Sequence, residues 1–472
     1  MHSDTASNSS LNFAWDNRLT KEANATTTLI SDMAVTVVVL QTIVADSFGH
    51  YLPWGMVVLP LVATNLVSAW YARGHGLTAL PFGANTVFIM VVLGDVLAAQ
   101  DSDGLSRLGT DSQLLALLST ALILYSAVVL TVTFVVLWLR PTLPRQALML
   151  PLVAICCCYL ILTPILQLID KSLSALLAAL LLWLLLNRKA PGWLTWSIPF
   201  VVWGGLTWLV PDSGGESPPP PTIITASIAS SDVVGWLSSS LFWRDVAPLV
   251  GLIGTANAFA NLENLASAQK AGDVHDAHIT TFIACGGTLL AAAVGGGAPV
   301  TVYIGHPVYK EMGGKFFYGI AATVGLAAVL VPLGTWVMQW LPVHVLFGAV
   351  IFIGTGIASM VRHQVHSNRD RLKAAIPMLP IVAFWMQNNF AVNTPLLSIL
   401  GKGSPLVAIG WAMLLWSDGG RKERLVICLM LAAASLGGIV HAPALSWSAL
   451  ACSLVYGCIA AVISHPRCRR AL

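Results

Sequence analysis

Three asparagines in one apolar stretch are the first residues whose spacing points to chemistry. Asn257, Asn261 and Asn264 recur at i, i+4 and i+7 within residues 246–268, so a helix there would carry all three on one face. Their amides can hydrogen-bond a bound solute, or they can bond to a neighbouring helix at roughly 1 kcal/mol per contact. The spacing therefore predicts either a solute-binding stripe or a polar contact between helices.

Two titratable side chains accompany this stripe. Glu263 would cost about 2.5–3.5 kcal/mol as a charge at the centre of a membrane helix, and it either carries a proton or pairs with Lys270 near the membrane surface. His306 titrates near neutral pH, and it either couples protons or hydrogen-bonds irregular backbone. We predict that Glu263 and His306 are proton-coupling groups, and we interpret Lys310 as an interfacial residue whose charge reaches the membrane surface.

Two similar segments must position these side chains. "LTALPFGANTVFI" (77–89) and "GGGAPVTVYI" (295–304) combine Pro, Gly and β-branched residues, which disfavour a continuous helix. We predict a short strand followed by a half-helix in each segment, with the two strands paired antiparallel at membrane depth. Free main-chain N–H groups at the half-helix starts would then face a central cavity.

The predicted substrate-binding residues come from these segments and from the asparagine stripe. Aromatic rings among them could stack on a planar solute, although such rings are more often part of a core. Gln41 is a further residue that could reach the cavity. The predicted set is Phe82, Gly83, Asn85, Thr86, Asn257, Phe259, Asn261, Thr301, Val302 and Tyr303.

Composition identifies the environment of these segments. The chain is 56% hydrophobic and only 10% charged, whereas a soluble domain has about 25% charged residues. We therefore predict an all-α polytopic membrane protein. Apolar runs of the length needed to span a bilayer lie near 30–48, 54–71, 80–97, 113–138, 146–165, 171–187, 193–210, 246–268, 277–294, 300–310, 315–336, 340–361, 372–390, 403–417, 423–441 and 445–464.

Basic residues and one polar insert organise these sixteen spans. Lys and Arg concentrate in alternate loops, which predicts that both termini are cytoplasmic. The Pro/Gly/Ser-rich stretch from Pro211 to Asp232 reads as an extended connector after span 7, so seven spans on each side of it form inverted repeats. The predicted parts are 1–29 (N-terminal segment), 30–210 (first repeat, spans 1–7), 211–245 (external linker), 246–417 (second repeat, spans 8–14) and 418–472 (two extra spans and a basic tail).

The sequence carries no motif for an enzyme or a bound cofactor. It contains no Walker A, GxSxG or HExxH pattern, its histidines are scattered, and its eight cysteines lie mostly in apolar runs. No basic block indicates nucleic acid. We predict no cofactor, no metal, no catalytic residues and no nucleic-acid partner.

The segments "TALPFGANT", "NLENLASAQKAGD" and "GAPVTVYIGH" resemble the nucleobase–ascorbate transporters and the related sulfate permeases, and most of all bacterial xanthine/uracil/vitamin C permease-like proteins. The resemblance implies a seven-plus-seven inverted repeat, with a core domain (spans 1–4 and 8–11) that moves against a gate domain (spans 5–7 and 12–14), often as a homodimer. It implies proton-coupled uptake of a nucleobase-like solute by alternating access in the bacterial inner membrane. In the nucleobase branch an acidic residue stands where this chain has His306, and the alternative is an anion permease of the sulfate/bicarbonate type.

Overall fold

The fold is given by a computed structural model of the 472-residue chain. For some helix residues, the structure describes the main chain but not the side chain. The structure describes residues 7–48, 50–85, 88, 111–138, 150, 153–154, 156–171, 173–188, 192–209, 222–224, 228, 230–240, 242–303, 305–340, 343–362, 367–390, 394–416, 421–438, 440–442 and 445–464.

The chain divides into two compact units, each made of two separate stretches of sequence. The first unit comprises Met1–Thr133 and Glu216–Val343, and the second comprises Phe134–Gly215 and His344–Leu472. This division follows the predicted grouping of spans 1–4 with 8–11 and of spans 5–7 with 12–14. It also assigns the two extra C-terminal spans to the second unit.

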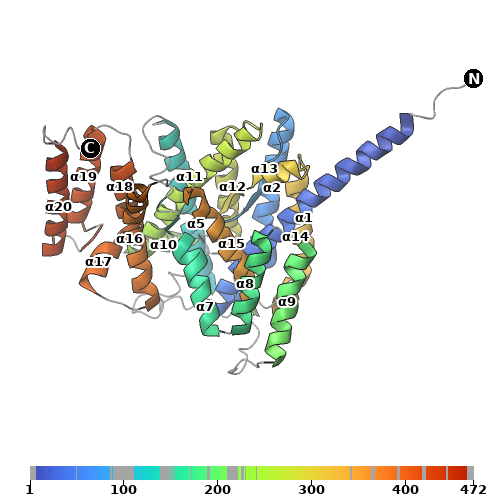
Figure 1. Cartoon of the computed structure of the whole chain (residues 1–472), viewed down its shortest axis with the longest axis horizontal. Coiled ribbons are helices and arrows are strands. Elements are labelled where there is room, and N and C mark those ends of the chain that lie inside the picture. Colours follow the sequence, from blue (N-terminus) through green and yellow to red (C-terminus); the bar gives the residue numbers. More distant parts are fainter. Residues whose placement is uncertain are drawn as a thin grey trace, which may run out of the picture. The chain divides into compact units, whose positions relative to one another are not determined.

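The described part of the first unit contains long helices, among them α1, α2, α12 and α14 (Figure 1), and four short strands. Helix α2 packs against α12 and α14, and α1 also packs against α14. The helices of this unit are α1 (Ser7–Phe48), α2 (Trp54–His75), α5 (Asp111–Trp138, which continues into the second unit), α10 (Ser230–Ser238), the π-helix η4 (Phe242–Val246), α11 (Ala247–Lys270), α12 (Ala277–Val294), α13 (His306–Glu311) and α14 (Tyr318–Trp340). The strands are β1 (His50–Tyr51), β2 (Phe82–Ala84), β3 (Thr222–Ile223) and β4 (Val300–Val302).

The described part of the second unit is helical. Its C-terminal helices α19 and α20 lie side by side (Figure 1), and they coincide with the two extra spans predicted at 423–441 and 445–464. The elements are η3 (Cys156–Leu162, a π-helix), α7 (Thr163–Lys171), α8 (Leu173–Asn187), α9 (Gly192–Leu209), α15 (Val343–Arg362), α16 (Asn368–Phe390), α17 (Pro395–Gly401), α18 (Ser404–Trp416), α19 (Arg421–Leu436) and α20 (Trp447–Ser464).

Several helices meet the length and hydropathy that a membrane crossing needs. Among the described residues five do so alone, and Pro395–Gly401 with Leu406–Trp416, bent by 76°, would make a sixth. The protein is therefore a multi-pass membrane protein, while the count of sixteen spans and the cytoplasmic termini remain predictions. The five are Ala25–Ala45, Trp54–His75, Ser112–Trp138, Ala277–Val294 and Tyr318–Met338.

The predicted strand pair is confirmed. Strands β2 and β4 pair antiparallel, with Phe82 opposite Val302, Gly83 opposite Thr301 and Ala84 opposite Val300. Hydrogen bonds from Asn85 N to Pro299 O (2.9 Å) and from Tyr303 N to Pro81 O (2.8 Å) extend the ladder at both ends. The half-helix predicted after β4 is present as the short helix α13, whereas only Phe88 of the half-helix predicted after β2 is described.

Side chains satisfy the outer edges of this two-stranded sheet. Asn65 on α2 accepts a hydrogen bond from Phe82 N at its Oδ1 (3.0 Å), and its Nδ2 donates to Phe82 O (2.8 Å). Thr288 on α12 does the same for Val300, at 3.0 and 3.2 Å. Unpaired backbone is costly at membrane depth, so these two residues make an isolated pair of strands tolerable there. Their equivalent places fit an inverted repeat, which remains a prediction.

The predicted external linker, residues 211–245, contains helices in its second part. Helix α10 begins at the end of the stretch Pro211–Asp232, for which an extended connector is predicted, and the π-helix η4 follows. Upstream of these helices, β3 pairs in parallel with β1. The Pro/Gly/Ser composition is confined to the first part of the linker, whereas "SSDVVGWLS" supplies apolar residues and an acid in the first turn that suit a helix.

Candidate functional site

The asparagine stripe of α11 faces the broken segment around β4. Asn257 Oδ1 and Asn261 Oδ1 lie 2.8 and 2.9 Å from the hydroxyl of Thr301, and Asn264 Nδ2 donates to Val302 O at 3.1 Å. The prediction that the three share one face is confirmed by these contacts. Their use of β4 as a common partner makes this the centre of the candidate site.

Asn85 joins the other broken segment to the same cluster. Its Oδ1 accepts the main-chain N–H of Phe88 at 3.0 Å, which fixes the orientation of the amide. Its Nδ2 consequently donates to Asn257 Oδ1 at 3.0 Å and to the Tyr125 hydroxyl at 3.1 Å. The oxygen of Asn257 must therefore point toward Asn85, so its own NH2 group points elsewhere.

Two amide nitrogens in this cluster have no partner. Asn257 and Asn261 are only 7% and 2% exposed, yet neither Nδ2 has a hydrogen-bond acceptor in the described part of the chain. The hydroxyl of Thr301 has a single proton, so it cannot donate to both asparagine oxygens at once. Because buried polar groups are nearly always paired, this cluster has hydrogen-bonding capacity that the described residues leave unused.

Tyr303 covers the sheet on the face that carries Thr301. A Cβ atom at Gly83 would overlap the Tyr303 ring, so only glycine permits this close approach. The Tyr303 hydroxyl donates to the main-chain carbonyl of Asp32 at 3.1 Å and lies 2.7 Å from the Thr36 hydroxyl. Tyr303 therefore links the strand pair to α1.

The other predicted residues fall in different places. Phe82 is fully buried and Val302 is buried, while Phe259 is two positions from both Asn257 and Asn261 and so lies on the opposite face of α11. Gln41 donates to Leu52 O and accepts from Leu52 N, both at 2.8 Å. It therefore supports the turn before α2.

Two predicted positions lie outside this description. Thr86 is not among the described residues, and the side chain of Glu263 is likewise outside the described part of α11. Their predicted roles, in solute binding and in proton coupling, stay predictions.

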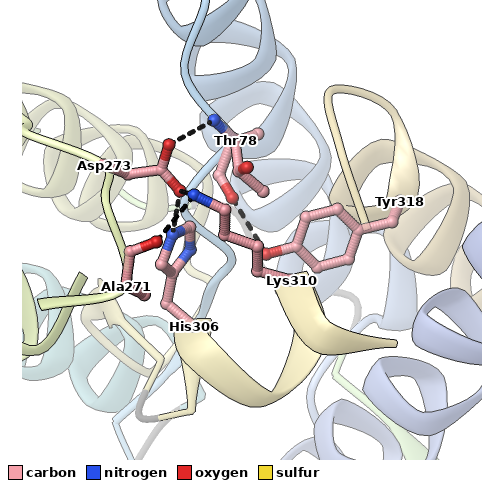
Figure 2. Close-up of polar contacts among 7 residues, drawn as sticks. Thr78, Ala271, Asp273, His306, Lys310 and Tyr318 are labelled. Carbon is pink, nitrogen blue, oxygen red and sulfur yellow. Dashed lines mark hydrogen bonds and ion pairs between the residues drawn. The ribbon is translucent and has the colours of Figure 1, made fainter. Parts of the chain in front are cut away.

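His306 belongs to a separate ion-pair cluster, shown in Figure 2. Its Nε2 lies 3.0 Å from Asp273 Oδ2, which also lies 2.7 Å from Lys310 Nζ. Thr78 N donates to Asp273 Oδ1 at 3.3 Å, and Lys310 Nζ donates to Ala271 O at 2.9 Å. His306 is thus engaged with a carboxylate that sequence reasoning missed.

This cluster gives Lys310, which the sequence suggests is an interfacial residue, a carboxylate partner that was not predicted. Lys310 is one third exposed but is committed to Asp273, and Tyr318 donates to the neighbouring Ala79 carbonyl at 2.9 Å (Figure 2). The cluster ties α13 to the turns after α2 and α11. The sequence does offer one indication of this carboxylate. Gly272, just before Asp273, predicts a turn, and a turn there could place the Asp273 side chain against a neighbouring element.

Electrostatics in this cluster favour one charge state. Burial acts to raise the pKa of Asp273, but hydrogen bonds from Lys310 and His306 outweigh burial and lower its pKa to about 2. Burial lowers the pKa of His275 to about 4, and the neighbouring His306 contributes to this shift. The two imidazoles meet edge to face at a centroid distance of 5.7 Å. Asp273 is therefore ionised and His275 is neutral at physiological pH.

Asp32 on α1 is a second carboxylate that sequence reasoning did not select. Its Oδ2 accepts a short hydrogen bond from the Tyr309 hydroxyl. The residue lies inside the apolar window Ala25–Ala45. From the sequence, only the presence of an acid in an apolar window could have indicated Asp32. Its partner Tyr309 comes from a distant part of the chain and could not be predicted.

Comparison with known proteins places the fold. No family model matches this chain, and no curated protein sequence matches it. Among solved structures, the transmembrane domain of the cyanobacterium bicarbonate transporter BicA superposes with a TM-score of 0.50 at 13% identity, over 84% of this chain and 97% of that one. The chain therefore shares the fold of that transporter transmembrane domain, while membership of the nucleobase–ascorbate family stays a prediction.

Proposed function

We propose that the protein is a secondary transporter that moves a small solute by alternating access, coupled to protons. The solute would bind beside Thr301, where Asn257 and Asn261 supply hydrogen bonds. The observation that carries this proposal is the pair of buried, unpartnered amide nitrogens on α11. Donors of this kind favour a solute that presents acceptor oxygens, because binding it would satisfy groups that are otherwise costly to bury.

Of the solute classes that present such oxygens, we favour a small oxyanion. The amides of Asn257 and Asn261 beside Thr301 have N–H groups that no described residue accepts, and hydrogen bonds to an ion are about twice as strong as neutral ones. Phe82 is fully buried in the strand pair and Phe259 lies on the far face of α11, so neither supports stacking. The fold shared with a bicarbonate transporter is compatible with this class.

A nucleobase-like solute is the second candidate, as the sequence resemblance implies. The specific observation in its favour is the Tyr303 ring, which covers Gly83 on the same face of the sheet as Thr301. A planar base could stack on such a ring and offer its carbonyl oxygens to the asparagine amides. Both candidates use the same donors, so they can be separated by changing one of them.

Substitution of Asn261 tests the site and the solute class together. Asn261→Ala removes a donor and should weaken solute binding about tenfold, as loss of a hydrogen bond to a bound group implies. Asn261→Asp replaces this donor with a carboxylate, which would repel an oxyanion and weaken its binding further. A nucleobase also carries N–H groups and can turn one toward the carboxylate, so its binding should fall less than in Asn261→Ala. Binding is measured by thermal shift of the purified protein with sulfate, bicarbonate, uracil and xanthine.

The matched control is Asn187→Ala, because Asn187 is an exposed asparagine at the end of α8 whose amide donates to Trp183 O. It should bind every solute like the unmodified protein. Equal binding by Asn261→Ala and the unmodified protein would remove the α11 amides from the site.

A further inference from the structure

Asp32 differs from Asp273, the carboxylate of the ion-pair cluster, in how its charge is compensated. Asp273 is paired with both Lys310 and His306. Asp32 has only a phenol, the Tyr309 hydroxyl, as donor to its carboxylate, and no cationic side chain among the described residues pairs with it. A carboxylate inside a membrane-spanning window without a cation is costly and is typically functional.

The immediate contacts of Asp32 connect it to the candidate site. Its side chain binds Tyr309 of α13, and its main-chain carbonyl accepts the hydroxyl of Tyr303. Tyr303 lies against Gly83 of β2, and Thr301 lies two residues before it on β4. One residue of α1 therefore contacts both Tyr303, two residues after Thr301, and Tyr309 on the short helix that follows β4.

The hydrogen bond between Asp32 and Tyr309 can run in either direction. With an ionised carboxylate the tyrosine must donate, because the carboxylate has no proton. When a proton binds to one carboxyl oxygen, the resulting O–H can donate to the tyrosine oxygen instead, and the tyrosine proton must turn to another acceptor. Proton binding at Asp32 would thereby alter the anchoring of α13, and release would return the proton to water.

Among the described residues, no cationic group pairs with Asp32. Tyr303 and Tyr309 contact Asp32 itself, whereas the other titratable groups on the elements packed against α1 have other partners or other positions. These others are Tyr318, which donates to the Ala79 carbonyl, His306 and Lys310, which bind Asp273, the exposed Glu311 at the end of α13, and His50 and Tyr51 on β1.

We propose that Asp32 is the group that binds the coupling proton, in place of or in addition to the predicted Glu263 and His306. This inference rests on the proposed transport function. In this proposal the Asp32 carboxylate binds and releases one proton per transport cycle. Tyr309 is a positioning residue: its hydrogen bond to Asp32 changes with protonation and so changes how α13, which follows β4, is held.

The test separates exchange from accumulation in proteoliposomes, with labelled sulfate and labelled uracil as probes. Asp32→Asn should retain exchange of internal for external probe within about twofold, because exchange needs no net proton movement. In the same variant, accumulation of the probe driven by an inward proton gradient should fall at least tenfold, to the level reached without a gradient. Glu311→Gln, an exposed acid on α13, should accumulate the probe like the unmodified protein.

A direct measurement of protonation keeps the inference independent of the solute. Infrared difference spectra of the unmodified protein between alkaline and acidic pH should contain a carbonyl band from a protonated carboxyl that is lost in Asp32→Asn. Tyr309→Phe keeps the carboxyl but removes its donor, so the band should persist at a shifted midpoint pH.

The outcomes distinguish the two proposals. If neither probe is exchanged by the unmodified protein, the proposed function fails for these solutes, and the infrared band alone decides whether Asp32 binds a proton. Gradient-driven accumulation by Asp32→Asn equal to that of the unmodified protein would overturn the inference, as would an unchanged carboxyl band in that variant.

Discussion

At the residue scale, neighbouring ionisable groups differ because their partners differ. Asp273 stays charged since Lys310 and His306 donate to it. His275 packs against this cluster without a charged partner of its own, so burial keeps it neutral. His275 is therefore a pH-sensitive group that lies beside the ion-pair cluster without belonging to it.

The stability of the protein should fall in mild acid because of His275. Its pKa is about 4 in the folded protein and about 6.5 when unfolded, so the unfolded chain binds more protons between these values. Stability contributed by the neutral imidazole is thus present above pH 6.5 and is lost as the pH falls toward 4. We expect a loss on the order of 1–3 kcal/mol, and His275→Gln should flatten the decline.

The measurement is thermal unfolding of the detergent-purified protein between pH 7 and pH 4. His75→Gln is the matched control, since His75 is an exposed histidine at the end of α2, and it should leave the decline unchanged. An equally steep decline in His275→Gln would assign the acid sensitivity to another group.

At the element scale, the strand pair depends on side chains from adjacent helices. Strands β2 and β4 contribute three residues each, far fewer than an independently stable sheet requires. Asn65 and Thr288 satisfy the main-chain groups that would otherwise face neighbouring helices without partners. The broken segments are therefore specified jointly by their own Pro and Gly residues and by one polar residue on the helix before each.

Removal of either side chain should destabilise its strand. Thr288→Val keeps the shape of the side chain but leaves the N–H and the carbonyl of Val300 buried without this partner, at a cost of about 1–3 kcal/mol. Thr288→Ser keeps the hydroxyl and should recover most of that loss. The readout is the melting temperature in detergent, and equal melting temperatures for the Val and Ser variants would show that the hydroxyl is dispensable.

At the scale of the whole molecule, each unit is built from two distant stretches of the chain. This arrangement arises naturally if the two halves insert with opposite orientation, because equivalent spans can then pack together from both sides. The distribution of basic residues predicts the same orientation independently. The predicted inverted repeat therefore has consequences for which loops are accessible from outside.

Epitope accessibility tests this orientation. A tag inserted after Gly215, within the predicted external linker, should bind antibody on intact cells whose outer envelope is permeable to it. A tag at the N-terminus should become accessible only after the inner membrane is permeabilised, because Arg18 and Lys21 precede the first span. Equal accessibility of both tags would contradict the predicted odd number of spans between them.

The sequence by itself determined the properties that depend on local composition and backbone preference. Apolar runs predicted the positions of the helices, Pro and Gly marked the two interrupted segments, and a period of 3.6 placed Asn257, Asn261 and Asn264 on one face. Each of these follows from residues close together in the chain, so the physical preferences act without knowledge of distant partners.

Only the tertiary structure decided which polar groups meet. Tyr309 reaches Asp32 across 277 positions and His306 reaches Asp273 across 33, and no local preference encodes such distances. The protonation state and role of a buried ionisable group depend on its partners and on its burial, so the chemistry of Asp32, Asp273 and His306 became defined only when packing brought distant segments together.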